Sequence, residues 1–150
     1  GLQARAARGG LQLRHVKPHG ALYNQAARDT ALADAVARAV RAVDPALALV
    51  GLAGSELLQA AQRHGLRPLA EAFADRAYAS DGSLLPRGQR GAVLHETAEV
   101  LEQVRELVER QRVRTPAGWL PLQADTLCLH GDGPAALALA RALRAEWPLE

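Results

Sequence analysis

Residues 15–24 contain rare side chains that could do chemistry. Lys17 is the only lysine among 18 basic residues, and Asn24 is the only asparagine. Arginine cannot replace lysine as a compact charge or as an amine that transfers protons, so a single retained lysine indicates a function. Lys17 could bind a phosphate or a carboxylate, and His19 could act as a general base or a metal ligand. The alternative is that Lys17 is solvated and that His19 only makes a hydrogen bond in a loop.

A second group of polar side chains lies in residues 71–78, which also contain the only phenylalanine. The group consists of Glu71, Asp75, Arg76 and Tyr78. Glu71 and Asp75 are candidates for general acid–base catalysis or for Mg²⁺ binding. Arg76 and, further along the chain, Arg87 could clamp a phosphate. Because arginine is abundant in this chain, an ordinary structural or surface role is the strong alternative for both.

The third group, residues 128–134, contains the only cysteine, followed by His130, Gly131 and Asp132. Asp132 is a candidate for acid–base catalysis or Mg²⁺ binding, although it could instead stabilise the start of a helix. The turn around Gly131 could receive an anion, because free backbone N–H groups point outward at a helix N-terminus. Cys128 is interpreted as a core residue. The histidines outside these groups are interpreted as structural or surface residues: His15, His64 and His95.

The elements that position these groups can be predicted from hydrophobic patterns. Apolar runs and loose alternation predict main strands at residues 11–17, 46–52, 69–73 and 126–130. Apolar residues at helical spacing predict helices at residues 22–29, 30–43, 55–64, 97–111 and 134–146. Residues 113–122 contain a turn that could join two short strands. The alternation of strands and helices predicts an α/β fold, in which βα units surround a parallel sheet.

Each of the three polar groups follows or ends a predicted strand. In βα folds, ligands bind at the carboxyl ends of the strands, so the groups are expected to converge on one rim. Residues 75–90 have no periodicity, and a loop of this length is usually functional or disordered. The helix at residues 55–64 is expected to begin at the N-cap Ser55 and to end at Gly65.

Length and composition limit the possible classes of protein. At 150 residues the chain is predicted to form a single domain, 1–150, with an aliphatic core because only 3% of the residues are aromatic. The net charge of +2 is small and basic residues alternate with acidic ones, which argues against nucleic-acid binding. The sequence contains no apolar run of about 18 residues, so no membrane span is predicted, and no signal peptide is visible. The default expectation is a cytoplasmic protein.

Together the three groups resemble the motifs of the LamB/YcsF family, the 5-oxoprolinase A subunits. Residues 16–24 match the most specific family motif, and residues 71–78, with residues 81–82 and 85–87, resemble a second one. Residues 128–132 resemble a third, a Cys-Val-His-Gly-Asp pattern in which Leu129 stands in place of the valine. Order and spacing agree over nearly the whole chain. Gly133 departs from the pattern, because a more polar residue is expected before the proline.

Family members are about 250 residues long, and two motifs that open them are absent from this sequence. The first ten residues have the pattern of the back half of a helix that is closed by two glycines. The resemblance therefore implies that this chain is the C-terminal portion of a distorted (β/α) barrel of the glycoside hydrolase/deacetylase type. We expect its missing strands to carry part of the site.

The resemblance implies ATP-dependent hydrolysis of 5-oxo-L-proline to L-glutamate, with ATP and Mg²⁺ as cofactors and two partner subunits, B and C. Phosphate transfer to the lactam oxygen would create a leaving group, and this transfer needs positive charge and a base that orients water. The expected catalytic residues are Lys17, His19, Asp75 and Asp132. The expected substrate- and nucleotide-binding residues are Asn24, Glu71, Arg76, Tyr78, His130 and Gly131. No side chain is assigned as a metal ligand.

Two alternatives stay open. A metal-dependent amide or carbohydrate deacetylase on a related barrel would hold its ion with His19, His130 and an aspartate. Alternatively, the chain is an inactive fragment of the enzyme, because essential groups would lie in the missing part. Metal analysis and an assay of ATP-dependent turnover distinguish these possibilities.

Overall fold

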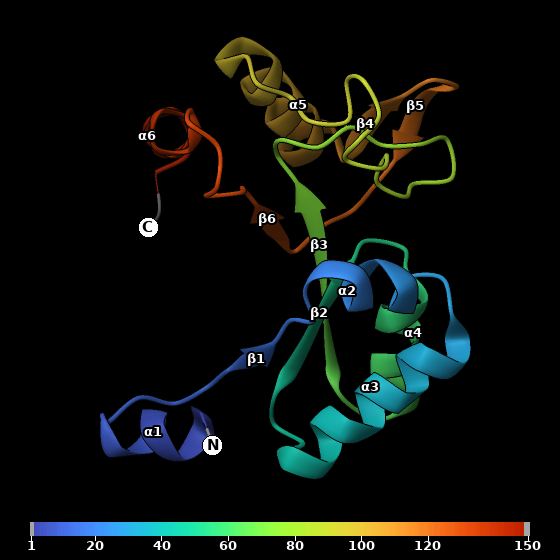
Figure 1. Ribbon diagram of the computed structural model, residues 1–150, viewed down its shortest axis with the longest axis vertical. Coiled ribbons are helices and arrows are strands. Elements are labelled where there is room, and N and C mark those ends of the chain that lie inside the picture. Colours follow the sequence, from blue (N-terminus) through green and yellow to red (C-terminus); the bar gives the residue numbers. More distant parts are fainter. Residues whose placement is uncertain (1, 149–150) are drawn as a thin grey trace. The chain divides into compact units, whose positions relative to one another are not determined.

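The structure is a computed structural model that describes residues 2–148 (Figure 1). The chain forms two compact units, which divide between Ala70 and Glu71 and are described one at a time. Parallel strands alternate with helices along the chain, as predicted for an α/β fold. The single domain over residues 1–150 stays a prediction.

The first unit builds its core from alanines together with larger aliphatic residues. Its elements are α1 (Leu2–Arg8), β1 (His15–Val16), α2 (Gly20–Ala26), α3 (Thr30–Val43), β2 (Ala48–Leu52) and α4 (Glu56–Arg63). β1 and β2 pair in parallel, with Val16 opposite Leu49. All of β2 is buried, as its continuous apolar run predicts. Ala37 of α3 and Ala60 of α4 are fully buried in the same hydrophobic cluster, and alanine at these positions allows the two helices to approach closely.

Local signals set the ends of the helices in this unit. The Asp29 side chain accepts a hydrogen bond of 3.0 Å from the backbone N–H of Leu32 and so caps α3. Ser55 occupies the predicted N-cap position of α4, but its hydroxyl makes no hydrogen bond within the described residues, so the predicted side-chain cap is not formed. Gly65 has a φ of +66°, which is the left-handed conformation that ends α4 as predicted.

Several predicted elements have different boundaries in the structure: β2 begins at Ala48 rather than at residue 46, and the next strand begins at Arg67 rather than at residue 69. β1 contains two residues instead of residues 11–17, because the ladder with β2 is short and Leu11 is 70% exposed. α2 begins at Gly20 and ends at Ala26, whereas the pattern predicted residues 22–29. The earlier start follows from Gly20, whose φ of +62° turns the chain out of the Lys17–Pro18 segment and into the helix.

The second unit gathers two of the three polar groups. β3 (Arg67–Phe73) runs into this unit and pairs in parallel with β6 (Thr126–Cys128), with Phe73 opposite Cys128. The sheet order is β1-β2-β3-β6. β6 ends at Cys128 rather than at the predicted residue 130, since its partner β3 ends at Phe73. The carboxyl ends of β3 and β6 therefore meet at the same edge.

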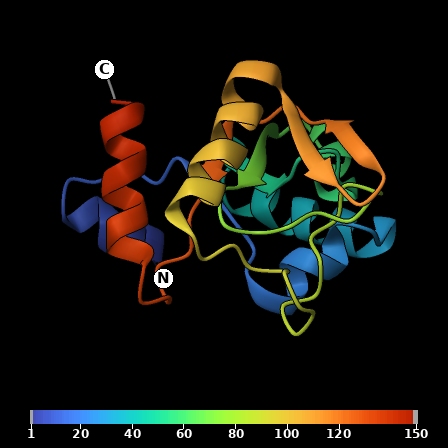
Figure 2. The ribbon, with the colours of Figure 1, turned by 90° about the horizontal axis from the view of Figure 1, so that it is seen from above.

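Two helices and a hairpin complete the second unit. They are α5 (Thr97–Arg110), β4 (Arg112–Thr115), β5 (Gly118–Pro121) and α6 (Ala136–Glu146). β4 and β5 form the predicted hairpin, and β4 packs beside α5 (Figure 2). A buried cluster that contains Val100 and Val104 of α5 and Leu139 of α6 holds the two helices together. α6 starts at Ala136, two residues later than predicted, because a turn closes from Gly133 to Ala136 before the helix begins.

The long segment after β3 is ordered rather than structureless. Isolated β-bridges join Arg76 to Val93 and Tyr78 to Leu84. Backbone hydrogen bonds of 3.0 Å from Ala77 to Ala92 and from Leu85 to Ala77 close the loop further. The loop can therefore hold its side chains in fixed places, which the aperiodic sequence did not reveal.

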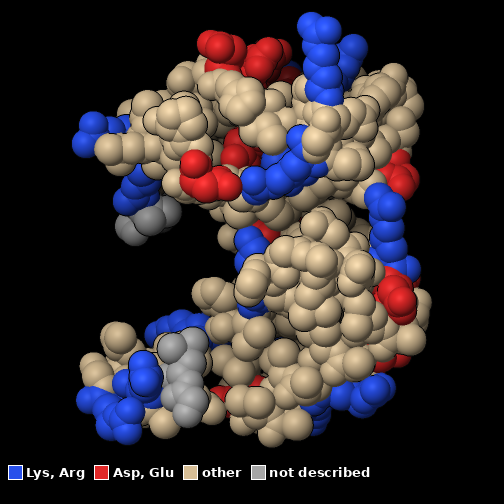
Figure 3. Space-filling model, in the orientation of Figure 1, with Lys and Arg blue, Asp and Glu red and all other residues tan. Residues whose placement is uncertain are grey.

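Within residues 2–148, no helix is both long and apolar enough to cross a membrane. Basic and acidic side chains are interspersed on the face shown in Figure 3. Some of these charges are paired in the first unit, where Asp34 contacts Arg63 at 3.0 Å and His64 at 3.1 Å. His64, which the sequence analysis interpreted as a structural or surface residue, therefore contacts a carboxylate within its own unit.

Candidate functional site

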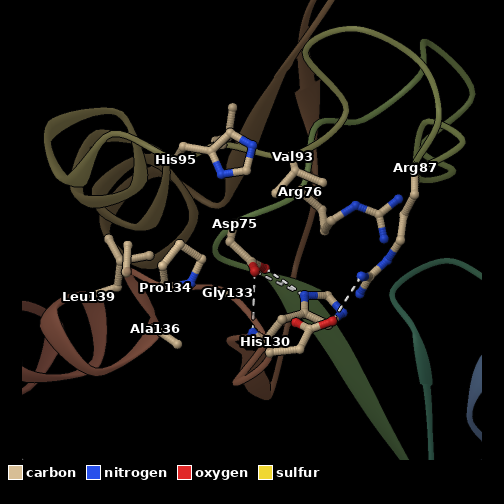
Figure 4. A pocket seen from close by; sticks show the side chains of 13 residues that line it. Asp75, Arg76, Arg87, Val93, His95, His130, Gly133, Pro134, Ala136 and Leu139 are labelled. Carbon is tan, nitrogen blue, oxygen red and sulfur yellow. Dashed lines mark hydrogen bonds and ion pairs between the residues drawn. The ribbon is translucent and has the colours of Figure 1, made fainter.

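Asp75 and His130 form the central contact of the site, where β3 and β6 end side by side. His130 Nδ1 lies 2.9 Å from both carboxylate oxygens of Asp75, and the backbone N–H of His130 donates to Asp75 Oδ2 at 3.2 Å (Figure 4). Asp75 is 5% exposed. A carboxylate only accepts hydrogen bonds, so this geometry assigns the proton to Nδ1 and the lone pair of the neutral ring to Nε2.

The packing around His130 restricts the orientation of its ring. The imidazole stacks on Phe73, with 5.5 Å between the ring centroids and an angle of 22° between the planes. A buried aspartate that holds a histidine through Nδ1 leaves Nε2 available to accept or donate a proton, which is the arrangement of a general base or acid. The pair can therefore do acid–base chemistry, with His130 as the reacting group and Asp75 as its support.

Arg87 and Asp132 form an exposed ion pair next to the Asp75–His130 pair. Arg87 Nη1 lies 3.2 Å from Asp132 Oδ2, and the two side chains are 51% and 70% exposed. The pKa of Asp132 lies below its usual range, first because its carboxylate accepts a hydrogen bond from its own backbone amide and then because of Arg87. Asp132 is therefore ionised near neutral pH, and another anion could take its place on Arg87.

Arg76 is buried and organises the loop that carries Arg87. Its Nε donates to the carbonyl of Ala92 at 3.1 Å, and its Nη2 donates to the carbonyl of Leu85 at 2.5 Å. Burial lowers the pKa of Arg76, and the nearby charge of Arg87 lowers it further. These hydrogen bonds occupy donors of the Arg76 guanidinium and give the side chain a structural function. A contribution of Arg76 to phosphate binding would therefore come mainly from its positive charge.

A small cavity lies beside these groups, and it brings together side chains from three parts of the second unit. Its lining includes Asp75, Arg76, Arg87, His95, His130, Asp132 and residues 133–136 before and within α6. The cavity volume is about 60 Å³. A water molecule in the liquid occupies about 30 Å³, so the cavity admits a small reacting group. His95, which the sequence analysis interpreted as a structural or surface residue, is exposed and also lines the cavity (Figure 4).

Tyr78 and Glu71 were predicted to bind substrate or nucleotide, and both are buried in the second unit. Tyr78 is 1% exposed, and its hydroxyl accepts a hydrogen bond of 2.8 Å from the backbone N–H of Phe73. Burial raises the pKa of Tyr78 above its usual range. Glu71 is 4% exposed and lies opposite Thr126 in the ladder of β3 and β6. Tyr78 therefore supports the end of β3, and binding by either residue stays a prediction.

The turn that contains Gly131 follows β6 and leads towards α6. A Cβ atom built on Gly131 would meet no other atom within 4 Å, so the turn is open at this point. Because α6 begins at Ala136, Gly131 does not sit directly at the helix N-terminus, where the sequence placed it. Anion binding by this turn stays a prediction.

The first polar group lies in the first unit, after β1. Lys17 Nζ lies 5.6 Å from the centroid of the Tyr23 ring. His19 is exposed and precedes α2 without capping it through its side chain. Asn24 Nδ2 donates to the carbonyl of Gly20 at 3.1 Å. The structure thus brings the second and third groups together, whereas the convergence of all three groups stays a prediction.

Metal-ligating side chains do not cluster in the part of the chain that the structure describes. Among those residues, no group of three or more His, Cys, Asp or Glu side chains is arranged to hold a metal ion. The deacetylase alternative, in which His19, His130 and an aspartate hold an ion, stays a prediction.

Comparisons with known proteins agree with the motifs. The sequence pattern of the LamB/YcsF family matches residues 1–148. The chain is 56% identical to the 5-oxoprolinase A subunit of Erwinia tasmaniensis, over 99% of this chain and 61% of that protein. The crystal structure of the lactam utilization protein from Thermus thermophilus matches with a TM-score of 0.86 and 42% identity, over 95% of this chain and 57% of the other.

These similarities confirm the predicted fold class, in which parallel strands alternate with helices in part of a (β/α) barrel. The chain spans 61% and 57% of the lengths of these two proteins. The activity, substrates and partners of a whole protein of this kind therefore enter only as proposals.

Proposed function

The chain belongs to the LamB/YcsF family, and on that premise we propose that it takes part in the ATP-dependent hydrolysis of 5-oxo-L-proline to L-glutamate. The observation that carries this proposal is the Asp75–His130 pair, which lies beside two arginines in one small cavity. The name of the Erwinia tasmaniensis relative, which is that of one lettered subunit of a 5-oxoprolinase, supports the substrate and an assembly with other subunits. ATP, Mg²⁺ and two partner subunits are parts of the proposal.

The reaction suits an aspartate–histidine pair with cations nearby. A lactam carbonyl is a poor electrophile, and transfer of the terminal phosphoryl group of ATP to its oxygen, with release of ADP, would activate the carbonyl carbon towards water. Addition of water would then break the ring C–N bond, whose nitrogen would take a proton and become the amine, and would leave an acyl phosphate. A second water molecule would hydrolyse the acyl phosphate to L-glutamate and phosphate. His130 Nε2 would take a proton from the attacking water, while Asp75 would keep the ring oriented and stabilise its protonated form. When bound, ATP supplies the phosphoryl group, and Mg²⁺ balances part of its charge.

The charges in the cavity fit a single phosphate group. Arg87 is exposed and pairs with Asp132. It could exchange this carboxylate for a phosphate oxygen and so keep a negatively charged partner. Asp132 would then be available to the Mg²⁺ that accompanies the nucleotide. Pockets that enclose whole small molecules measure about 300–1,000 Å³, so the base and ribose of ATP would lie outside this cavity.

The proposal is tested by assaying this chain with its two partner subunits for glutamate and ADP formed from 5-oxoproline and ATP. We expect equal amounts of the two products. Replacement of His130 by alanine should lower turnover about 10²–10⁴-fold, the usual contribution of a general acid or base. His64→Ala is the matched control, because His64 also contacts an aspartate, at 3.1 Å, but does not line the cavity.

Each outcome of this assay has a separate meaning. Turnover by the relative from Erwinia tasmaniensis with the same partners, but not by this chain, would support the inactive-fragment alternative. A His130→Ala chain with full turnover would reject the assigned site. Absence of 5-oxoproline-dependent turnover from both proteins would reject the reaction itself.

A further inference from the structure

We propose that Gln103 is a positioning residue for the Asp75–His130 pair, an inference that rests on the proposed function of that pair. Gln103 lies in the middle of α5, outside the three polar groups of the sequence. Its side chain is half-buried and reaches the segment that carries Asp75. It acts on the backbone and does not touch the reacting atoms.

Gln103 contacts backbone carbonyl groups on both sides of Asp75 in the sequence. Gln103 Nε2 lies 2.9 Å from the carbonyl oxygen of Phe73, 3.0 Å from that of Ala74 and 2.9 Å from that of Arg76. An amide oxygen could not face three carbonyl oxygens, so the atom at this place is the nitrogen. Its two N–H groups serve three acceptors, which means that one hydrogen is shared.

These hydrogen bonds fix the point where the chain leaves the sheet. The backbone N–H of Ala74 still donates to the carbonyl of Cys128 at 2.9 Å, as a continuation of the ladder between β3 and β6. Beyond Ala74 the ladder ends, and Gln103 holds the carbonyls on both sides of Asp75. The carboxylate therefore cannot shift relative to His130 unless several hydrogen bonds are broken.

The helix that carries Gln103 is itself firmly held. Val100 and Val104 are 0% and 1% exposed, and they pack in the cluster that joins α5 to α6. Catalytic groups need to be held within about 0.5 Å of the productive geometry, and a side chain on a packed helix provides such support. The geometry points to Gln103 as the link between the core and the Asp75–His130 pair.

The alternative is that Gln103 only adds to the overall stability by pairing three carbonyls. The two possibilities differ in what happens to the His130 Nδ1–H group below the unfolding temperature. Its exchange with water, followed by nuclear magnetic resonance of this chain, reports how often the hydrogen bond to Asp75 opens. This signal needs no substrate, nucleotide or partner, so its result is independent of the turnover assay.

The test compares Gln103→Met with the control Gln59→Met. Methionine has a similar length but no donor, and Gln59 is exposed on α4. We expect Gln103→Met to speed exchange of the His130 Nδ1–H about tenfold, which corresponds to the loss of one ordinary hydrogen bond. Gln59→Met should leave the exchange rate unchanged.

An unchanged exchange rate in Gln103→Met, with a lower unfolding temperature, would overturn the proposal and leave Gln103 with a stabilising role alone. If Gln103→Met does not fold, Gln103→Asn replaces it, because asparagine keeps an uncharged amide but is one methylene shorter, which moves the donor away from the three carbonyls. Failure of both variants to fold would also overturn the proposal, since Gln103 would then be required by the whole unit.

Discussion

The Asp75 carboxylate determines which nitrogen of His130 carries a proton. Both of its oxygens lie 2.9 Å from Nδ1, so the negative charge favours the tautomer in which Nε2 has the lone pair. An asparagine can present its N–H₂ group to Nδ1 and so favour the opposite tautomer. The function of this pair therefore depends on the charge at position 75 and not only on its shape.

We predict that Asp75→Asn lowers 5-oxoproline-dependent turnover about 10⁴-fold, the size of effect expected when a catalytic histidine is held in the wrong tautomer. The imidazole nitrogen chemical shifts of His130 would show the change directly. Asp34→Asn is the control, because Asp34 contacts His64 in the first unit. Full turnover by Asp75→Asn with an altered tautomer would show that this orientation is not needed.

The short stretches that contain rare residue types include much of the candidate site. Asp75, His130 and Asp132 were singled out from the sequence, and the structure places all three at one cavity. His95 and Gln103 gave no such signal, because each is an ordinary residue whose position depends on how α5 and its preceding segment pack. A contact between residues 103 and 73 lies beyond what any local pattern can predict.

At the scale of elements, Glu106 joins α5 to the β-hairpin. Its carboxylate pairs with Arg110 on the same helix and accepts a hydrogen bond of 2.5 Å from Arg112 Nε on β4. The pKa of Glu106 lies below its usual range, first because of the hydrogen bond from Arg112. A lowered pKa in the folded state means that the ionised carboxylate stabilises the fold.

The sign of this shift leads to a prediction about pH. The stabilisation is fully present above the usual glutamate pKa of 4.5 and is lost as the pH falls through the lower pKa of the folded state. Glu106→Gln should therefore lower the unfolding midpoint at pH 7, and the difference from the original chain should shrink under acidic conditions. Urea denaturation over a series of pH values measures both effects.

Glu109→Gln serves as the control for this prediction. Glu109 lies on the same helix, is 52% exposed and pairs with Arg105 only at 4.0 Å, so its removal should have little effect at any pH. The electrostatic explanation would be contradicted if the difference in unfolding midpoint between the Glu106→Gln chain and the original chain did not vary with pH. Packing of the side chain would then account for the loss of stability.

Local sequence patterns predicted elements best where few distant contacts decide the boundaries. α3 begins and ends where its pattern predicts, because a capping aspartate and a stripe of apolar residues act within the helix. β6 is shorter than predicted, since its partner β3 ends at Phe73, and β1 is shorter because only His15 and Val16 pair with β2. The start of α6 was missed because the turn at Gly133 delays it.

At the scale of the whole molecule, the candidate residues are divided between the two units. Lys17, His19 and Asn24 belong to the first unit, and the Asp75–His130 pair belongs to the second. The sequence predicted that all three polar groups converge on one rim, and this convergence stays a prediction. Kinetic coupling between residues of the two units would test it without reference to their distance.

We predict that Lys17→Ala and His130→Ala are strongly non-additive in the turnover assay. When two residues act together in one site, the first substitution already removes most of the rate acceleration that they provide jointly. The double variant should therefore be little slower than the slower single variant. Arg38→Ala, which removes an exposed cation on α3, provides the additive reference when combined with His130→Ala. If the Lys17→Ala and His130→Ala factors simply multiply, the two residues serve separate steps or sites, and Lys17 must be sought in binding rather than in the chemistry at His130.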